Sequence, residues 1–139
     1  MVAFNLQIAI YQKLQGTSAL TQKVKGIYDH IPQHVTADNP SDSIFPYIIV
    51  GDDTHKSDDT DTELGFESEI TIHIWTRYLG LAENKQLQGE IYKALHRNSL
   101  SIAGYHLISM GFVDAKTFKD ADGLSQHGVQ TFRLLTEQL

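Results

Sequence analysis

Residues 66–76 read Phe-Glu-Ser-Glu-Ile-Thr-Ile-His-Ile-Trp-Thr, and this stretch decides the fold. Its side chains fall into two alternating sets. Because successive side chains of a β-strand point to opposite faces of the sheet, the alternation predicts a half-buried strand. The set predicted to face helices comprises Phe66, Ser68, Ile70, Ile72 and Ile74, and the opposite set comprises Glu67, Glu69, Thr71, His73 and Trp75.

A second strand is predicted immediately before this one. Residues 45–50 are mostly apolar, and Pro46 stands near the start, where a missing N–H group is tolerated. Residues 52–63 separate the two strands and hold one lysine and six acids, Asp52, Asp53, Asp58, Asp59, Asp61 and Glu63. Like charges repel one another and little apolar surface is available, so we predict that residues 52–63 form the solvated, poorly ordered tip of a long hairpin.

The rest of the chain adds helices before and after this hairpin. Helical spacing of apolar residues predicts a long first helix and a third helix, with a short second helix between the first helix and Gly26. The expected elements are helices over 3–15 and 83–98, strands over 27–30, 105–118 and 125–137, a loop over 33–43 and a turn over 120–123. The order α-α-β-β-β-α-β-β predicts an α+β fold, with a mainly antiparallel sheet of four to five strands and helices on one face.

The third predicted helix contains a glycine at its middle. Its buried stripe is expected to be Leu87, Ile91, Ala94 and Leu95. Glycine inside a helix costs up to about 1 kcal/mol relative to alanine. We therefore expect Gly89 to permit a close packing contact.

The first predicted helix is apolar over an unusually wide arc. Leu6, Ile10 and Leu14 form one stripe, and a second stripe consists of Phe4, Ile8 and Tyr11. A surface helix needs an apolar arc of only about 100°, and the two stripes together cover about twice that. Either the helix is sunk in its own core, or it packs inward on one stripe and against another subunit on the other.

Composition sets limits on the class of protein. The 139 residues carry seventeen acids and eleven Lys or Arg, a formal charge of −6, and no cysteine. The excess of acids argues against a surface that binds nucleic acid or an anionic membrane. The absence of cysteine excludes disulfides and thiol catalysis. The longest apolar run, 44–50, is seven residues, against about 18 needed for a membrane span. No basic residue precedes Lys13 and there is no small-residue cleavage pattern, so no signal peptide is expected. One soluble cytosolic domain over residues 1–139 is expected.

Catalytic motifs are missing. The sequence has no Gly-x-Ser-x-Gly elbow, no phosphate-binding glycine loop and no His-Glu-x-x-His. Residues from Asp59 onward do not match a calcium-binding EF-hand loop, because Leu64 and Ile70 occupy the positions that require glycine and glutamate. We expect no enzyme activity, catalytic residue, metal or cofactor. One alternative from another class is a small metal-dependent hydrolase using Asp52, Asp53, Asp58, Asp59 and Asp61.

Several short motifs follow one another in a characteristic order along the chain. In chain order they are Ile27-Tyr28-Asp29-His30-Ile31-Pro32, Phe45-Pro46-Tyr47-Ile48 with Gly51, His73-Ile74-Trp75-Thr76-Arg77 with Gly80, a helix with Ile91 and Leu95, and Asp122-Gly123 before His127-Gly128 and Phe132-Arg133. In this order and spacing, residues 6–137 resemble the tail-completion, or tail-terminator, proteins of tailed phages and gene transfer agents.

The resemblance implies a structural protein of the virion, placed at the head–tail joint and found in the host cytoplasm during assembly. Such a single terminator-like domain forms a homohexameric ring on the tail tube protein, stops tube polymerisation and presents a surface to the head-side connector or stopper. DNA passes through the lumen, where a net acidic protein would not hold it. Phe4, Ile8 and Tyr11 then become the expected subunit interface, and the acidic hairpin tip would face the lumen or an axial partner. Another head–tail connector or neck component is the alternative within this class.

Overall fold

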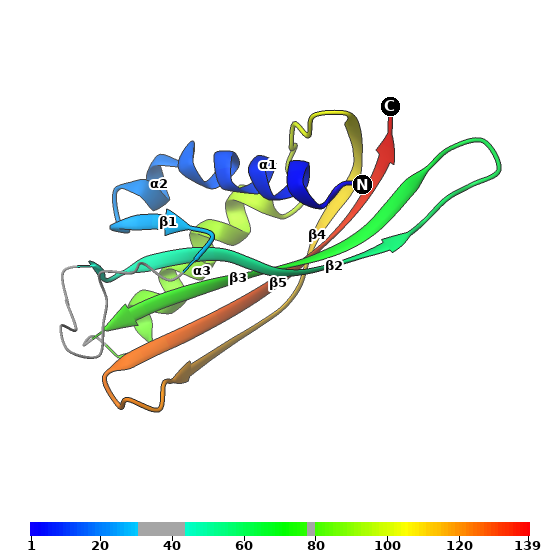
Figure 1. Cartoon of the computed structure of the whole chain (residues 1–139). Helices are drawn as coiled ribbons and strands as arrows, with labels where there is room; N and C mark the ends of the chain where they lie inside the picture. The colour runs from blue at the N-terminus through cyan, green and yellow to red at the C-terminus, as the bar shows by residue number, and fades with distance from the viewer. Residues whose placement is uncertain (31–43, 78–79) are drawn as a thin grey trace.

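A computed structural model describes residues 1–30, 44–77 and 80–139 (Figure 1). The loop expected over 33–43 lies outside the described residues. The elements are α1 (Ala3–Gln15), α2 (Ser18–Thr21), β1 (Gly26–Tyr28), β2 (Tyr47–Ser57), β3 (Gly65–Arg77), α3 (Ala82–Leu95), β4 (Tyr105–Lys119) and β5 (Ser125–Gln138). This order confirms the predicted α+β succession. None of the helices in these described ranges is long and apolar enough to span a bilayer.

The five strands form one mixed sheet in the order β1-β2-β3-β5-β4. β2, β3, β5 and β4 pair antiparallel with their neighbours, and β1 pairs parallel with β2. The parallel pairing is possible because the connection between β1 and β2 is far longer than a tight hairpin. The helices lie together on one face of the sheet, as predicted (Figure 1).

The core lies between that face and the helices. Ile70, Ile72 and Ile74 of β3 are buried in one cluster with apolar side chains from two helices. These helix residues are Leu6, Ile10 and Leu14 of α1 and Leu87, Ile91 and Leu95 of α3. The alternation of β3 therefore predicted the buried face correctly.

The acidic segment departs from its prediction. β2 continues through Asp53 to Ser57, and these residues pair with β3 from Ile70 back to Phe66, so residues 52–57 are strand rather than loop. Only the segment from Asp58 to Leu64 turns the chain. The prediction was wrong here because the strand's polar side chains, except that of His55, remain exposed while its backbone gains hydrogen-bond partners on β3. The far end of this β2–β3 hairpin, which we call the arm, projects beyond the helices (Figure 1), and its β3 strand stays paired with β5 as far as Gly65.

Gly89 also differs from expectation. A Cβ atom built on Gly89 meets nothing within 4 Å, so no close contact with the described residues requires a glycine there. We expect Gly89→Ala to raise the free energy of unfolding by about 0.5–1 kcal/mol, because alanine loses less backbone entropy in a helix. Urea unfolding at fixed protein concentration measures the change.

Gly128 supplies the matched control for that substitution. A Cβ atom on Gly128 would collide with the side chain of Asn84 on α3, so Gly128→Ala should destabilise the protein. A loss of stability in Gly89→Ala would show that its surroundings are tighter than the structure indicates.

Candidate interaction surfaces

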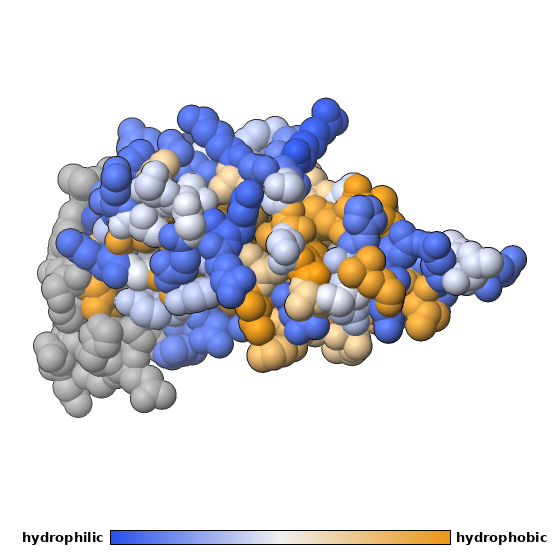
Figure 2. All heavy atoms as spheres, turned by 90° about the horizontal axis from the view of Figure 1, so that it is seen from above, coloured by the Kyte–Doolittle hydropathy of each residue, from blue (hydrophilic) through white to orange (hydrophobic). Residues whose placement is uncertain are grey.

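The outer side of α1 is an exposed apolar stripe. Leu6, Ile10 and Leu14 are fully buried, whereas Phe4, Ile8 and Tyr11 are 73%, 38% and 37% exposed. The wide apolar arc of this helix is therefore only half covered within the described chain. Hydrophobic residues gather on the face that carries α1, toward the projecting β2–β3 arm (Figure 2). We call Phe4, Ile8 and Tyr11 the α1 stripe.

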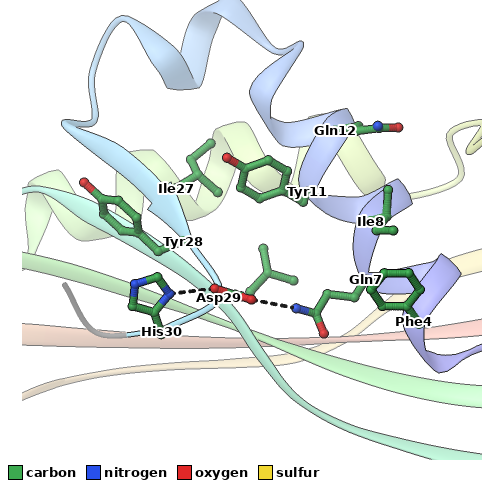
Figure 3. Close-up of a pocket in the computed structure, with 10 residues that line it drawn as sticks. Phe4, Gln7, Ile8, Tyr11, Gln12, Ile27, Tyr28, Asp29 and His30 are labelled. Atoms are coloured by element: carbon green, nitrogen blue, oxygen red, sulfur yellow. Dashed lines mark hydrogen bonds and ion pairs between the residues drawn. The ribbon is translucent and has the colours of Figure 1, made fainter. Parts of the chain in front are cut away.

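A groove runs between the α1 stripe and β1. Its volume is about 460 Å³, and Ile27 and Val50 contribute to its lining together with the stripe. At its polar end, Gln7 Nε2 donates to Asp29 Oδ2 at 3.4 Å and His30 Nδ1 donates to Asp29 Oδ1 at 2.7 Å (Figure 3). The hydrogen bond from His30 lowers the pKa of Asp29 below its usual value. Apolar walls with a polar rim suit the side chains of a protein partner.

The acidic residues of the arm do not converge. Asp52 is the extra residue of a bulge between Gly51 and Asp53, and it accepts a hydrogen bond from His73 Nε2 at 3.0 Å. Asp53 lies 3.0 Å from His55 Nε2, and Asp59 accepts a hydrogen bond from the backbone of Gly65.

The remaining acids of the segment, Asp58, Asp61 and Glu63, are exposed at the tip. Within the described ranges no three His, Cys, Asp or Glu side chains are grouped to hold a metal ion. The arrangement gives no support to the alternative of a metal-dependent hydrolase.

The face of the sheet opposite the helices carries an aromatic cluster that was not predicted. The ring of His127 on β5 stacks on Trp75 with centroids 4.0 Å apart, and Phe118 of β4 meets it edge-on at 5.0 Å. His73 Nδ1 and His127 Nε2 are 2.8 Å apart. When Asp52 is ionised and His73 is neutral, His73 carries its proton on Nε2, and His127 Nε2 then donates to His73 Nδ1.

Burial makes His127 sensitive to pH. Burial first, and the neighbouring His73 second, lower the pKa of His127 below 6.5. Well above pH 6.5 the ring is neutral in both folded and unfolded chains. As pH falls below that value the unfolded chain takes up the proton first, so the free energy of unfolding should decrease. We expect His127→Gln to reduce this decrease between about pH 7 and pH 5.

The exposed His106 provides the control for this prediction. Urea unfolding across the same pH range should give the same slope for His106→Gln as for the wild type. An unchanged slope in His127→Gln would show that other groups control the acid sensitivity.

The architecture of the chain is that of small proteins from phage-type particles. A chain of the solved structure "Virion of native gene transfer agent (GTA) particle" superposes with a TM-score of 0.81 at 24% identity, covering 98% of this chain and 97% of the other. The solved structure of the gp17 protein of bacteriophage SPP1 superposes with a TM-score of 0.60 at 23% identity, covering 93% and 86%.

The sequence itself establishes the family. The family model for tail completion protein gp17 matches residues 8–137. The tail completion protein gp17 of Bacillus phage SPP1 is 25% identical over 127 residues, which covers 89% of this chain and 86% of that protein. The chain belongs to the tail completion protein gp17 family, and the resemblance noted in the sequence is confirmed. Its role is structural, in completing the tail, and its place is in the virion.

Proposed function

We propose that this tail completion protein assembles head-to-tail into a closed ring that caps the tail tube, stops its polymerisation and presents a docking surface to the head-side connector or stopper. Six copies follow from the resemblance to terminator proteins. In this role the protein is a subunit of an assembly rather than an enzyme. Its partners are further copies of itself, the tube protein and the connector.

The exposed α1 stripe is the observation that carries this proposal. Three large apolar side chains on one helix face are open to solvent beside an apolar-walled groove. Exposed apolar patches on soluble proteins mark contact surfaces. A cyclic ring requires one surface of each subunit to meet a different surface of the next, and the α1 stripe with its groove supplies the first of them.

The charge of the chain supports passage of DNA through the ring. A formal charge of −6 disfavours tight retention of a phosphate backbone, which is bound chiefly by Lys and Arg side chains. In the proposed ring, the acidic β2–β3 arm faces either the lumen or an axial partner. DNA is then a passing molecule and not a ligand.

Light scattering on a sizing column tests the proposal. We expect the wild-type protein, alone or with polymerised tail tubes, to form a discrete ring, and its addition to growing tubes to stop their lengthening. Electron microscopy would show the ring at one tube end. A protein that remains monomeric at high concentration and beside tubes contradicts the proposal, and binding only to a connector would indicate another neck component.

A further inference from the structure

The β4 edge of the sheet is open along half its length. Near the middle of β4, Arg97 donates a backbone hydrogen bond to Met110 at 2.9 Å, and His96 Nδ1 accepts one from Phe112 at 3.0 Å. Beyond Phe112, no strand within the described residues pairs with the outer side of residues 113–119. Val113 is the extra residue of a bulge and is 39% exposed. Unpaired strand edges are templates for pairing with another chain.

A second open edge lies at the other end of the sheet. β1 pairs only with Tyr47, Ile48 and Ile49 of β2. The outer side of β2 from Asp53 to Ser57 therefore has no strand beside it within the described ranges. The α1 stripe lies on this flank, because its groove is bounded by β1 and by Val50 of β2. The two free segments, residues 113–119 of β4 and 53–57 of β2, lie on opposite edges of the sheet, because β2 extends beyond β1.

The charges beside the two edges are complementary. Asp114 and Lys116 of β4 lie opposite Thr131 and Val129, and Lys56 of β2 lies opposite Glu67. These pairings place all three side chains on the sheet face without helices. All three are exposed and have no ion-pair partner in the described part of the chain. An antiparallel alignment that puts Asp114 opposite Lys56 also puts Lys116 opposite Thr54, next to Asp52.

We infer that the second surface of the ring contact is the free edge of β4, which pairs antiparallel with residues 53–57 of β2 on the next copy, with Asp114 opposite Lys56. This inference rests on the proposed ring. β2 and β4 run in opposite directions, because three antiparallel pairings separate them. Across the sheet Asp114 is level with Gly51, and Lys56 lies five residues further along β2, so the strands must be inclined to the ring axis, as they are in a β-barrel. Rotation about that axis keeps every strand at the same inclination, so adjacent copies meet with β4 and β2 antiparallel. The sheet then continues from subunit to subunit, and the α1 stripe faces the β4 side of its neighbour.

Charge reversal tests the pairing directly. We expect Asp114→Lys and Lys56→Glu each to place like charges opposite one another and to raise the protein concentration for half-assembly by about tenfold. The double variant restores opposite charges across the contact and should assemble like the wild type. Lys85→Glu, an exposed reversal on α3, is the control and should leave assembly unchanged.

Disulfide trapping tests which residues of β4 and β2 lie opposite one another in the contact. Because the chain has no cysteine, Thr54→Cys and Lys116→Cys introduce the only thiols. Directly opposed residues of antiparallel strands lie about 4.5–5.5 Å apart between Cα atoms, within the range of a disulfide. With diamide as the oxidant, a mixture of the two single variants should give mixed dimers, and neither variant alone should. The double variant should give a ladder of linked subunits.

The outcomes separate this inference from the proposed ring. A ring that yields no mixed dimers and tolerates both charge reversals overturns the edge contact and leaves the ring intact. Dimers formed by Lys116→Cys alone would mean that two β4 edges meet, which also overturns it. A wild-type protein that never forms a ring overturns both proposals. Circular dichroism checks that each variant is folded.

Discussion

Replacing Ile72 by alanine is expected to lower the free energy of unfolding by about 2–5 kcal/mol. Ile72 is fully buried at the centre of β3, in the cluster that includes Leu87 and Ile91 of α3. Truncation removes buried methyl groups and leaves a cavity that the surrounding sheet and helices fill only in part. Urea unfolding at one protein concentration measures the loss, since assembly would otherwise contribute to apparent stability.

Ile108→Ala is the matched control for this substitution. Ile108 is the same residue type on β4, but it is 55% exposed. Its truncation should change stability by no more than about 0.5 kcal/mol, as for ordinary surface positions. A loss of that small size at Ile72 would mean that the isoleucine face of β3 does not form the core.

Local patterns were sufficient to predict the framework. The bounds of α1 are as predicted, because its apolar spacing and the following Gly16 mark a helix and its end. The alternation along β3 identified which face packs against helices. The motif series also identified the family, which the match over residues 8–137 confirms.

Features that depend on register between distant segments could not be predicted. His73 and His127 are 54 residues apart in the sequence, and they meet because β3 and β5 pair with Trp75 opposite His127. Nothing in either local sequence specifies that pairing. The bulge at Asp52 is a similar case: it turns one carboxylate toward His73, on the face without helices, while the strand continues to Ser57.

The acidic segment illustrates why composition alone misled. Six acids in twelve residues are typical of a solvated loop, yet half of the segment is strand. Strand pairing satisfies the backbone and leaves every second side chain free to point into solvent, so net charge does not prevent it. The same extension of β2 beyond β1 creates one of the two open edges used in the proposed ring contact.

Ile8→Glu is expected to convert the assembled protein into folded monomers. Ile8 lies at the centre of the α1 stripe and is 38% exposed in the single chain, so the fold tolerates a polar side chain there. In the proposed ring the same position is covered by a neighbour. Burying an unpaired carboxylate at every subunit contact is strongly unfavourable, because each charge loses its hydration without gaining a partner. Light scattering measures the mass, and circular dichroism with thermal unfolding measures whether the monomer is folded.

Leu64→Glu separates loss of the interface from a general effect of adding charge. Leu64 lies in the turn between β2 and β3 and is 55% exposed, and it is not part of the α1 stripe, its groove or either free strand edge. The ring should survive this change. If Ile8→Glu unfolds the chain, the α1 stripe belongs to the core of the single chain. If Ile8→Glu assembles as well as Leu64→Glu, the subunits meet elsewhere, and the free strand edges would have to form the contact without the helix.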